Sequence, residues 1–331
     1  MLALQDAGLY CARGEFHVDP WRAVKTALVT HAHGDHIALG CHTYYCAEEC
    51  EPLLRHRLTE NTNIKPIPYG VKFLLGHCAV SFHPAGHILG SAQVRVECGG
   101  EVWVVSGDYK RDFDPPCKPF EVVPCDVFIS EATFALPVYR WESGAKVAKE
   151  IYDWWQGNKA AGRTSVLLCY SLGKAQRVLA ELTAYTNEKV YLHGAAEELT
   201  RIYREQGVKM VPTEKVTEGK GSGSSLYDGA LVIAPPSAAG TPWLKRFRKV
   251  ELGFASGWMR IRGKLKQKAY DRGFVLSDHA DWPSLVRTIE ETGAKKVFLT
   301  HGISDPLVRY LQEKGVQAET LRTEFHGEEE A

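Results

Sequence analysis

Three histidines and one aspartate lie within six residues, directly after the apolar run at 27–29. They are His31, His33, Asp35 and His36. Imidazole nitrogen and carboxylate oxygen are ligands that suit zinc, manganese and iron. His31 and His33 are two residues apart, so an extended segment can direct both at one ion, while Asp35 and His36 turn toward a neighbouring one. A His-rich loop can also be a solvated turn, but so dense a string favours a metal site.

Two further residues are candidates for the same site. His87 follows a predicted strand in a loop that contains Gly86 and Gly90. Glycine permits the sharp turn that would direct one imidazole toward a metal, although a lone histidine is usually structural. Asp19 has two interpretations of equal weight: a carboxylate that orients a metal-bound imidazole through its second nitrogen, or the opener of an Asp-Pro turn.

The elements that position these residues are predicted strands, each followed by polar side chains. The strand at 101–105 precedes Asp108, and the strand at 126–129 precedes Glu131. The strands at 273–276 and 296–300 precede His279 and His301. Loops at the carboxyl edge of an α/β sheet are where sites form. Because polar residues follow the end of several predicted strands, we predict that they share one site and are not unrelated turn or helix-capping residues.

The middle of the chain has a different pattern. We expect a helix over 145–156, strands over 165–170, 190–193 and 230–234, and a parallel sheet. The turn from Ser171 to Lys174 lies between a strand and a helix, as a phosphate cradle would, but lacks the spacing of a nucleotide-binding loop. His31 and His301 can share a site only if the chain returns to it. We therefore predict an inserted α/β domain at 139–270, between metal-binding segments at 1–138 and 271–331.

Composition narrows the class of protein. The chain has 331 residues, 44% of them hydrophobic and 24% charged, as in a soluble globular protein of about two domains. No apolar run approaches the ~20 residues of a membrane helix, and no secretory signal is visible at the start. The chain has nine cysteines, and their spacing is not that of a disulfide-bonded scaffold. Free thiols are typical of the reducing cytosol, so we expect a cytoplasmic protein. Cys41, Cys46 and Cys50 form a second candidate metal cluster or, as we favour, ordinary buried thiols.

Charge is strongly uneven along this chain. The formal net charge is zero, yet the stretch at 242–272 holds ten Lys or Arg residues against two acidic ones, a local charge of +8. Such local asymmetry is typical of a groove for an anionic polymer, although a charge run is often only a solvated face.

These motifs resemble the metallo-β-lactamase fold in its β-CASP nuclease branch. The His-x-His-x-Asp-His signature is matched at 31–36, the first carboxylate by Asp19, the third His motif by His87 and the bridging aspartate by Asp108. The acidic, His and His motifs of the branch are matched by Glu131, His279 and His301. The turn that ends at Lys174 resembles a Leu-Gly-Arg turn in the inserted domain, with lysine in place of arginine, which loses bidentate phosphate contact.

Longer blocks resemble a bacterial subgroup, the DNA-ligase-associated exonucleases. The blocks are at 106–114, 130–141, 254–263 and 273–282. The resemblance implies a four-layer αββα sandwich with an inserted α/β β-CASP domain, and two divalent ions, zinc or manganese. It assigns His31, His33, His87 and Asp108 to the first ion, and Asp35, His36, Asp108 and His301 to the second.

The resemblance implies a two-metal DNA phosphodiesterase. A bridging hydroxide would attack the diester, and His279, held as an imidazolium by Glu131, would protonate the leaving oxygen; Asp35 and Asp108 complete the catalytic set. We expect a 5′ to 3′ exonuclease on single-stranded or flap DNA in repair, with functional association with a DNA ligase and a helicase. The expected nucleic-acid contacts are Lys110, Ser171, Lys174, Arg246, Trp258, Arg260, Arg262, Lys264 and Ser277.

Rival functions follow from the same motifs. The branch also contains RNA-processing endo- and exonucleases, and the sequence has no visible reader of the 2′-hydroxyl. A non-catalytic nucleic-acid-binding subunit is a weaker alternative, because every ligand position is filled here. Small-molecule hydrolases of the wider fold lack the insert. The residues leave open the physiological metal, the preference for a 5′-phosphate or 5′-hydroxyl end, the exo/endo balance and the oligomeric state.

Overall fold

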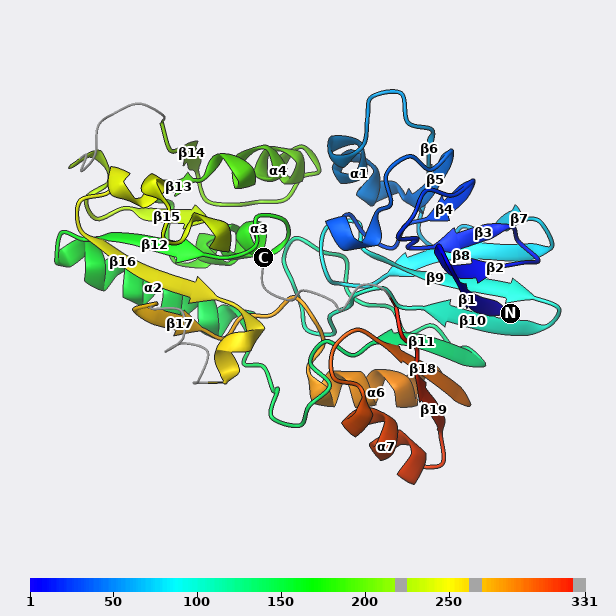
Figure 1. Cartoon of the computed structure of the whole chain (residues 1–331). Coiled ribbons are helices and arrows are strands. Elements are labelled where there is room, and N and C mark those ends of the chain that lie inside the picture. The colour runs from blue at the N-terminus through cyan, green and yellow to red at the C-terminus, as the bar shows by residue number, and fades with distance from the viewer. Residues whose placement is uncertain (218–224, 262–269, 324–331) are drawn as a thin grey trace. The chain divides into compact units, whose positions relative to one another are not determined.

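The computed structural model describes residues 1–217, 225–261 and 270–323. Contacts divide the chain into two compact units (Figure 1). The first contains Met1–Phe113, Cys117–Arg140 and the described chain from His279 to Thr323, and the second contains Asp114–Pro116 and Trp141–Asp278. The insert predicted over 139–270 thus compares with a second unit whose main segment runs over 141–278.

The first unit contains a six-stranded sheet in sequential strand order. Its strands are β1 (Leu2–Gln5), β2 (Gly8–Cys11), β3 (Phe16–Val18), β4 (Thr26–Leu28), β5 (Thr43–Ala47) and β6 (Ile64–Ile67). The first three strands are antiparallel, and β3 to β6 run parallel. After β5, a single 3-10 turn leads into helix α1 (Glu51–Arg57), which has proline in its first turn, where a missing N–H costs nothing.

A second sheet of the same unit has seven strands in the order β19-β18-β11-β10-β9-β8-β7. These strands are β7 (Phe73–Leu75), β8 (Cys78–Pro84), β9 (Ala92–Cys98), β10 (Glu101–Val105), β11 (Val127–Glu131), β18 (Lys296–Thr300) and β19 (Gln317–Thr320). Strand β18 pairs in parallel with β11 on one side and with β19 on the other. The C-terminal segment thus completes a sheet begun by the N-terminal half.

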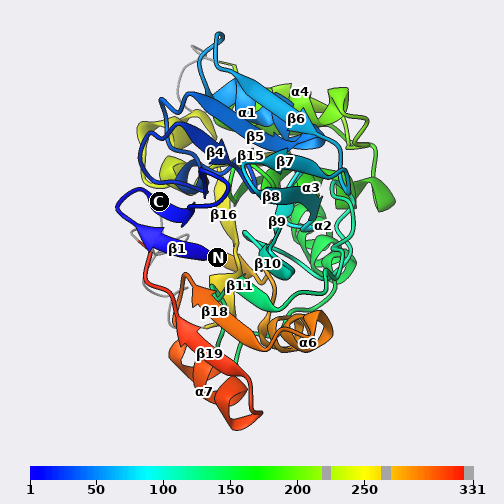
Figure 2. The same cartoon turned by 90° about the vertical axis from the view of Figure 1, so that its right-hand side faces the viewer.

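Helices α6 (Trp282–Thr292) and α7 (Asp305–Glu313) cover this second sheet. Both views show them beside β18 and β19 (Figures 1 and 2). Leu285 and Ile289 of α6 and Leu311 of α7 are buried in one apolar cluster with strand residues such as Phe128 and Val297. Burial of the helices' apolar stripes holds them on the sheet.

Side chains of the two sheets also meet. Cys11 of β2 lies 3.6 Å from Cys78 of β8, measured between sulfur atoms. Tyr45 of β5 stacks on Phe73 of β7 with ring centroids 5.3 Å apart. The apolar faces of both sheets are therefore buried against each other over part of their area.

The second unit is built on a six-stranded sheet in the order β14-β13-β15-β12-β16-β17. Its strands are β12 (Thr164–Leu168), β13 (Val190–Leu192), β14 (Thr213–Lys215), β15 (Leu231–Ala234), β16 (Val250–Ala255) and β17 (Arg272–Phe274). All its pairings are parallel, which confirms the parallel sheet predicted for the middle of the chain. Strand β12 is buried at every residue, as expected for a sheet covered on both faces.

Three helices pack on one face of that sheet: α2 (Gly144–Ala160), α3 (Lys174–Glu181) and α4 (Gly194–Glu205). The other face packs against Tyr227, Ala238, Phe247 and Met259, which lie in or beside short 3-10 segments. The strand predicted over 273–276 is found as β17 and pairs with β16 of this sheet. The reason is that Phe274 is buried in the core formed with α2 and α3.

Most predicted elements are confirmed. The strand over 296–300 matches β18, and the helix over 145–156 lies within α2. The Gly/Ser-rich stretch at 217–225 lies mostly outside the described residues. Within the described part of the chain, no helix is long and apolar enough to cross a bilayer.

Candidate metal centre

The candidate ligands all lie in the first unit, in loops that follow strands. His31 and His33 follow β4, and Asp35 and His36 belong to a 3-10 turn at Gly34–His36. His87 follows β8, Asp108 follows β10 and His301 follows β18. The ends of these strands, β4 in the six-stranded sheet and β8, β10 and β18 in the seven-stranded sheet, therefore position residues that are far apart in the sequence.

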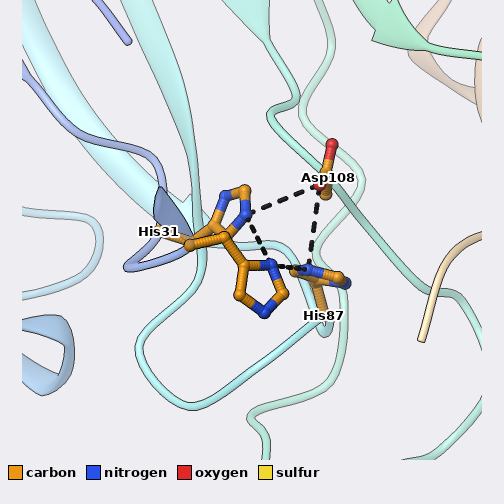
Figure 3. A group of neighbouring side chains, drawn as sticks. His31, His87 and Asp108 are labelled. Atoms are coloured by element: carbon orange, nitrogen blue, oxygen red, sulfur yellow. Dashed lines mark hydrogen bonds and ion pairs between the residues drawn. The ribbon is translucent and has the colours of Figure 1, made fainter. Parts of the chain in front are cut away.

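The first group of candidate ligands consists of His31, His33, His87 and Asp108. His33 Nδ1 lies 3.2 Å from His31 Nε2 and 3.1 Å from His87 Nε2. The Asp108 carboxylate lies 3.5 Å from His31 Nε2 and 3.8 Å from His87 Nε2. His31, His87 and Asp108 point toward one another (Figure 3). One carboxylate and three imidazoles thus converge on a small volume.

The electrostatics of this group suit a cation. Burial, together with the neighbouring imidazoles, holds the pKa of His31 well below its usual value despite the opposing effect of Asp108. The ring is therefore neutral and keeps a lone pair for a metal. Burial raises the pKa of Asp108, but His36 and other surrounding imidazoles outweigh burial and hold the pKa well below the usual range. The carboxylate is therefore ionised.

The second group consists of His36, Asp108 and His301. His36 Nε2 lies 3.5 Å from Asp108 and 3.7 Å from Asp35, measured to carboxylate oxygens. Burial lowers the pKa of His36, but Asp108, Asp35 and Asp19 outweigh it and hold the pKa well above its usual value. Three carboxylates around one imidazole make this position strongly cation-attracting.

Two orphaned nitrogen atoms test whether metal ions fit here. His36 Nε2 and His301 Nδ1 are buried, and neither makes a well-formed hydrogen bond among the described residues; the 3.5 Å contact of His36 Nε2 with Asp108 is an ion-pair distance. A buried polar atom that lacks a partner costs about 1–3 kcal/mol, and a divalent cation would satisfy both nitrogens. The donor set of imidazole and carboxylate is also the one that zinc and manganese accept. The residues present therefore fit divalent metal ions.

Asp19 orients His36 of the second group by contacting the ring nitrogen that does not face the other candidate ligands. Its Oδ2 lies 2.7 Å from His36 Nδ1, and the same carboxylate accepts hydrogen bonds from the Thr30 amide at 2.8 Å and the Thr30 hydroxyl at 2.6 Å. The Thr30 hydroxyl also lies 3.1 Å from His31 Nδ1. The geometry matches the orienting interpretation of Asp19, because its carboxylate holds the second ring nitrogen of a candidate ligand.

Backbone strain is found at the same place. Three non-glycine residues of the described chain have positive φ, and two of them are Asp19 (φ +42°) and His301 (φ +61°). Such conformations cost of order 1–3 kcal/mol and persist where the surrounding structure imposes them. Both strained residues belong to the candidate centre.

His279 and Glu131 form a separate pair beside Asp108. His279 Nδ1 lies 2.8 Å from Glu131 Oε2, and Glu131 Oε1 accepts a hydrogen bond from the Tyr109 amide at 2.7 Å. The side chains of His279 and Glu131 are at most 2% exposed. The carboxylate therefore fixes the ring and its tautomer, and the Nε2 atom of His279 is the one that can exchange a proton with a reactant.

A pocket lies next to the second group. Its polar lining includes Asp19, Asp35, His36, Ser106 and His301. Its apolar walls include Leu9, Val18, Val105, Ile129 and Leu321. The candidate ligands are thus at the edge of a space that a small group could enter, rather than sealed in the core.

The predicted nucleic-acid contacts have varied surroundings, each within its own unit. Lys110 and Lys174 are 2% exposed and Ser277 is 5% exposed. Ser171 is partly exposed and Arg260 is exposed. Trp258 packs partly on the apolar cluster of the second unit, and Arg246 donates a hydrogen bond to the Thr217 carbonyl oxygen at 3.4 Å. Arg262 and Lys264 lie outside the described residues. The role of all these residues in binding stays a prediction.

Sequence reasoning missed two residues of the centre. Thr30, which connects Asp19 to His31, carries no signal beyond its place before the His-rich string. Arg57 of α1 lies with Nη1 3.7 Å from the point where a Cβ of Gly34 would be. Burial lowers the pKa of Arg57 while the charge of Asp35 raises it. The Arg57 guanidinium therefore interacts electrostatically with Asp35 in the loop at 31–36. The three thiols Cys41, Cys46 and Cys50 are buried and free.

Fold and site together define a mixed α/β protein with a His- and Asp-rich candidate metal centre. The chain is 30% identical over 313 residues to a protein from Opitutus terrae named "Probable DNA ligase". It is 29% identical over 121 residues to "Endoribonuclease YSH1" of Eremothecium gossypii and 26% identical over 203 residues to "Endoribonuclease ysh-1" of Neurospora crassa. These matches cover 94%, 36% and 56% of this chain.

The chain spans less than a third of each of these three relatives: 30%, 14% and 22% of their lengths. A crystal structure of a protein of unknown function from Enterococcus faecalis V583 has a similar fold, with a TM-score of 0.58 at 11% identity over 90% of this chain and 79% of that one. No established family model matches the chain. The named relatives support a relation to nucleases of the β-CASP branch.

Proposed function

We propose that the chain is a metal-dependent phosphodiesterase acting on DNA, as a 5′ to 3′ exonuclease on single-stranded or flap ends. The observation that carries this proposal is the position of Asp108, which belongs to all three candidate groups of ligating side chains. One carboxylate shared by adjacent groups is the arrangement that two neighbouring cations need. In this proposal the first unit is the αββα sandwich of the metallo-β-lactamase fold and the second is the inserted β-CASP domain.

The first group would hold one ion through His31, His33, His87 and Asp108. The second would hold another through His36, Asp108 and His301, with Asp35 turned toward it. Divalent ions of this kind supply Lewis acidity, which stabilises charge on phosphoryl oxygens and makes a water molecule more acidic. The protein side chains supply the orientation: Asp19 fixes His36, and Thr30 fixes both Asp19 and His31.

His279 is the candidate general acid. Hydrolysis of a phosphodiester produces an alkoxide leaving group, and proton donation to it lowers the barrier. Glu131 fixes the Nδ1 side of the ring at 2.8 Å, so that Nε2 is the atom that would deliver the proton. Glu131 is itself fixed by the Tyr109 amide. The pair is therefore preorganised, which reduces the reorganisation needed during reaction.

An RNA substrate is the second candidate. It is favoured by the two relatives named as endoribonucleases, whereas DNA is supported by the relative named as a probable ligase. Functional association with a DNA ligase is likewise a prediction from the sequence. Association with a helicase, a role in repair and a cytoplasmic location are predictions from the sequence.

The test uses the whole chain with matched DNA and RNA oligonucleotides, labelled at the 5′ or 3′ end. Each is incubated with Mg²⁺, Mn²⁺ or Zn²⁺, and the product ladder is followed with time. The proposal predicts early release of 5′-terminal label as a mononucleotide from DNA, dependent on the metal. If RNA is cleaved internally while DNA stays intact, the RNA nuclease function replaces the proposed DNA exonuclease function. Absence of hydrolysis in metal-loaded protein would reject both.

A further inference from the structure

Helix α1 of the first unit carries two arginines near its C-terminal end, and their surroundings differ. Arg55 pairs with Glu51 one turn earlier: its Nη2 atom lies 2.6 Å and its Nε atom 2.9 Å from Glu51 Oε1. Arg57 is exposed to solvent and, among the described residues, makes neither a hydrogen bond nor an ion pair. Residues two apart on a helix do not face each other. The unpaired guanidinium of Arg57 therefore lies on a different side of the helix from Arg55.

Arg57 projects from a fixed base. Leu53 and Leu54 of α1 are fully buried, and they lie four and three residues before Arg57, so the turn that carries Arg57 is anchored in the core of the first unit. The helix ends there, with the Leu58 amide donating to the Leu54 carbonyl oxygen at 3.0 Å. A side chain on an anchored helix is positioned more precisely than one on a loop.

The guanidinium lies beside the loop that supplies the candidate metal ligands. Arg57 Nη1 is 3.7 Å from the point where a Cβ of Gly34 would be, and apart from the chain neighbours of Gly34 no other described atom is within 4 Å of that point. Gly34 stands between His33 of the first group and Asp35, whose carboxylate is 3.7 Å from His36 Nε2 of the second. Arg57 thus places a cation against the exposed part of a loop that serves both groups.

The charge of this guanidinium is only partly compensated. Asp35 is the acidic residue whose charge acts on it, and that carboxylate also attracts the His36 ring. Partial desolvation by surrounding protein atoms outweighs the effect of Asp35 and lowers the pKa of Arg57. Arginine nevertheless stays charged at neutral pH. A further anion beside Arg57 would therefore be stabilised.

We propose that Arg57 binds a backbone phosphate of the nucleic-acid substrate, next to the phosphate that reacts at the metal centre. A planar guanidinium presents paired N–H groups to phosphate oxygens, and no protein partner has to be displaced. Arg57 belongs to neither candidate ligand group, and the reacting phosphate is held by the ions in the proposed function, so the guanidinium takes a neighbouring phosphate. The inference rests on the proposed function, because it takes the reacting phosphate to lie at this centre.

Two plainer roles would also place an arginine here. A cation in the last turn of a helix interacts favourably with the helix dipole, and a cation beside Asp35 can hold the metal loop in place. Neither role involves nucleic acid. Both predict a change in stability or in bound metal when the arginine is lost, whereas the phosphate role predicts a change in the salt dependence of binding.

Arg57→Ala and Arg57→Lys test the assignment. Arg55→Ala is the matched control, because Arg55 is an exposed arginine of the same helix whose guanidinium is already paired. The full chain is titrated with a fluorescent single-stranded oligonucleotide whose phosphorothioate linkages resist hydrolysis, over a range of salt concentrations, and again after a chelator has removed the metal. Bound metal, the thermal midpoint of unfolding, and kcat/KM on DNA and on bis-p-nitrophenyl phosphate are measured on the same preparations.

Arg57→Ala should bind the oligonucleotide about 10-fold more weakly at low salt, the low end for a hydrogen bond to a charged group. Its log–log salt slope should fall by about 0.7, with metal and without. Arg57→Lys should keep the slope, which depends on charge, and recover only part of the affinity, because an ammonium group lacks the paired donors. The loss of kcat/KM should be larger on DNA than on the small diester, which has no second phosphate. Bound metal and the thermal midpoint should stay close to wild type, and Arg55→Ala should match wild type throughout.

Two results would overturn the inference. Wild-type affinity and slope in Arg57→Ala would make Arg57 a solvated cation. Loss of metal or of thermal stability, with an unchanged slope in the metal-free titration, would assign Arg57 to the support of the helix or of the loop at 31–36. Arg57→Gln removes the charge but keeps most of the side chain, and it carries the same test if the alanine variant is unstable.

Failure of the proposed function has a different signature. A metal-loaded wild-type protein that binds the oligonucleotide but hydrolyses neither DNA nor the small diester would reject the phosphodiesterase function, while the titrations would still decide whether Arg57 contacts phosphate. A wild-type protein that hydrolyses DNA and binds it with the same affinity and slope as Arg57→Ala would reject the role of Arg57 alone.

Discussion

Asp108 has more candidate partners than any other residue of the centre. Its carboxylate lies within 4 Å of the imidazoles of His31, His36 and His87. It follows β10, the strand that pairs with β9 and β11 in the middle of the seven-stranded sheet. A carboxylate at this point serves both ligand groups at once, so its loss should affect them together.

Replacement of Asp108 by alanine should therefore remove both metal ions, or nearly all activity, for one shared reason. We expect elemental analysis to find two ions in the wild-type chain and far fewer in Asp108→Ala. Asp112→Ala is the matched control, since Asp112 is an exposed aspartate in the following loop. Two ions retained with full turnover in Asp108→Ala would show that this carboxylate is not shared.

His279 should separate chemistry from metal binding. His279→Ala is expected to keep its metal content and to lose about 10²–10⁴ in rate, the usual contribution of a positioned acid or base. Glu131→Gln should lose less, because the amide oxygen can still accept from the ring. Elemental analysis and kcat measured on the same preparations check both. Loss of bound metal in His279→Ala at pH 7 would instead assign His279 to the ligand set.

A buried thiol, Cys46, and a partly buried one, Cys125, give a pH prediction at the same scale. Burial raises the pKa of Cys125 to about 12, and a hydrogen bond with Cys50, followed by burial, raises the pKa of Cys46 well above its usual value. A thiol with a raised pKa stays protonated at pH 8, and only the thiolate reacts. We expect native Cys46 and Cys125 to alkylate more than about 100-fold more slowly than in the unfolded chain, given an ordinary thiol pKa of about 8.5.

Iodoacetamide labelling followed by peptide mass spectrometry measures these rates. The native rates should continue to rise from pH 8 to pH 10, whereas those of the guanidinium-unfolded chain should level off near pH 9. Equal native and unfolded rates at pH 8 would mean that the Cys46 and Cys125 thiols are open to solvent.

At the scale of elements, the loop after β10 depends on one glycine. Gly107 has φ +55°, and a Cβ placed on it would lie 2.6 Å from Thr30 Cβ and Oγ1. Thr30 holds Asp19 and His31, so a methyl group here would disturb two supports of the metal centre. The close approach of the β10 loop to the β4 loop therefore requires glycine.

Gly107→Ala should lose metal as well as stability. Gly100→Ala is a control, since Gly100 has φ +84° but no atom within 4 Å of the added Cβ, and it should cost only about 1–3 kcal/mol of backbone strain. Metal content and the free energy of unfolding are measured for both variants. A Gly107→Ala protein with full metal content would indicate that the two loops can separate without harm to the site.

Elements were predicted better than their partners. The strand over 296–300 was found at the predicted bounds because Val297, Phe298 and Thr300 favour strand structure and the run ends at a His-Gly pair. Helix α2 begins earlier than predicted because Ser143 caps it, accepting a hydrogen bond from the Lys146 amide at 3.4 Å. The pairing of β17 with β16 could not be predicted, because strand partners depend on long-range packing that periodicity does not encode.

The ligand residues of the centre were predicted from their types and spacing together with the family resemblance, and the structure brings together six of the seven in its two main groups. The residues that hold these ligands in place were not predicted. Thr30 has no feature that marks it in a single sequence. The pairing of Lys174 with Asp278 within the second unit was not predicted either, because the two residues are remote in the chain. A local pattern reports the chemistry a side chain can do, whereas its partners are set by the tertiary fold.

At the scale of the whole molecule, charge is the relevant quantity. The chain is neutral overall, so we expect nonspecific attraction to nucleic acid to come chiefly from the basic stretch at 242–272. Replacement of Arg260 and Arg262 together by alanine should weaken DNA binding and lower the log–log salt slope by about 0.7 per lost phosphate contact. Trp258→Ala should weaken binding by about 1–3 kcal/mol per stacked base without a change in slope.

Fluorescence anisotropy over a salt titration measures both effects. Arg201→Ala serves as the control, because Arg201 pairs with Glu198 and Glu205 on α4 of the same unit. If the double Arg variant binds DNA like wild type at every salt concentration, the basic stretch is a solvated face and the strand runs elsewhere.

The order of strands in the seven-stranded sheet has a consequence for synthesis on the ribosome. Strand β18 fits between β11 and β19, yet it emerges after the whole of the segment at 141–278. During synthesis, the first unit therefore has an unpaired edge at β11 and lacks His301 until β18 emerges. The second unit is continuous over most of its length and can fold as it emerges. Such an edge can pair with another chain. Chaperone binding to nascent chains halted before residue 296 should therefore exceed that to chains halted after β19.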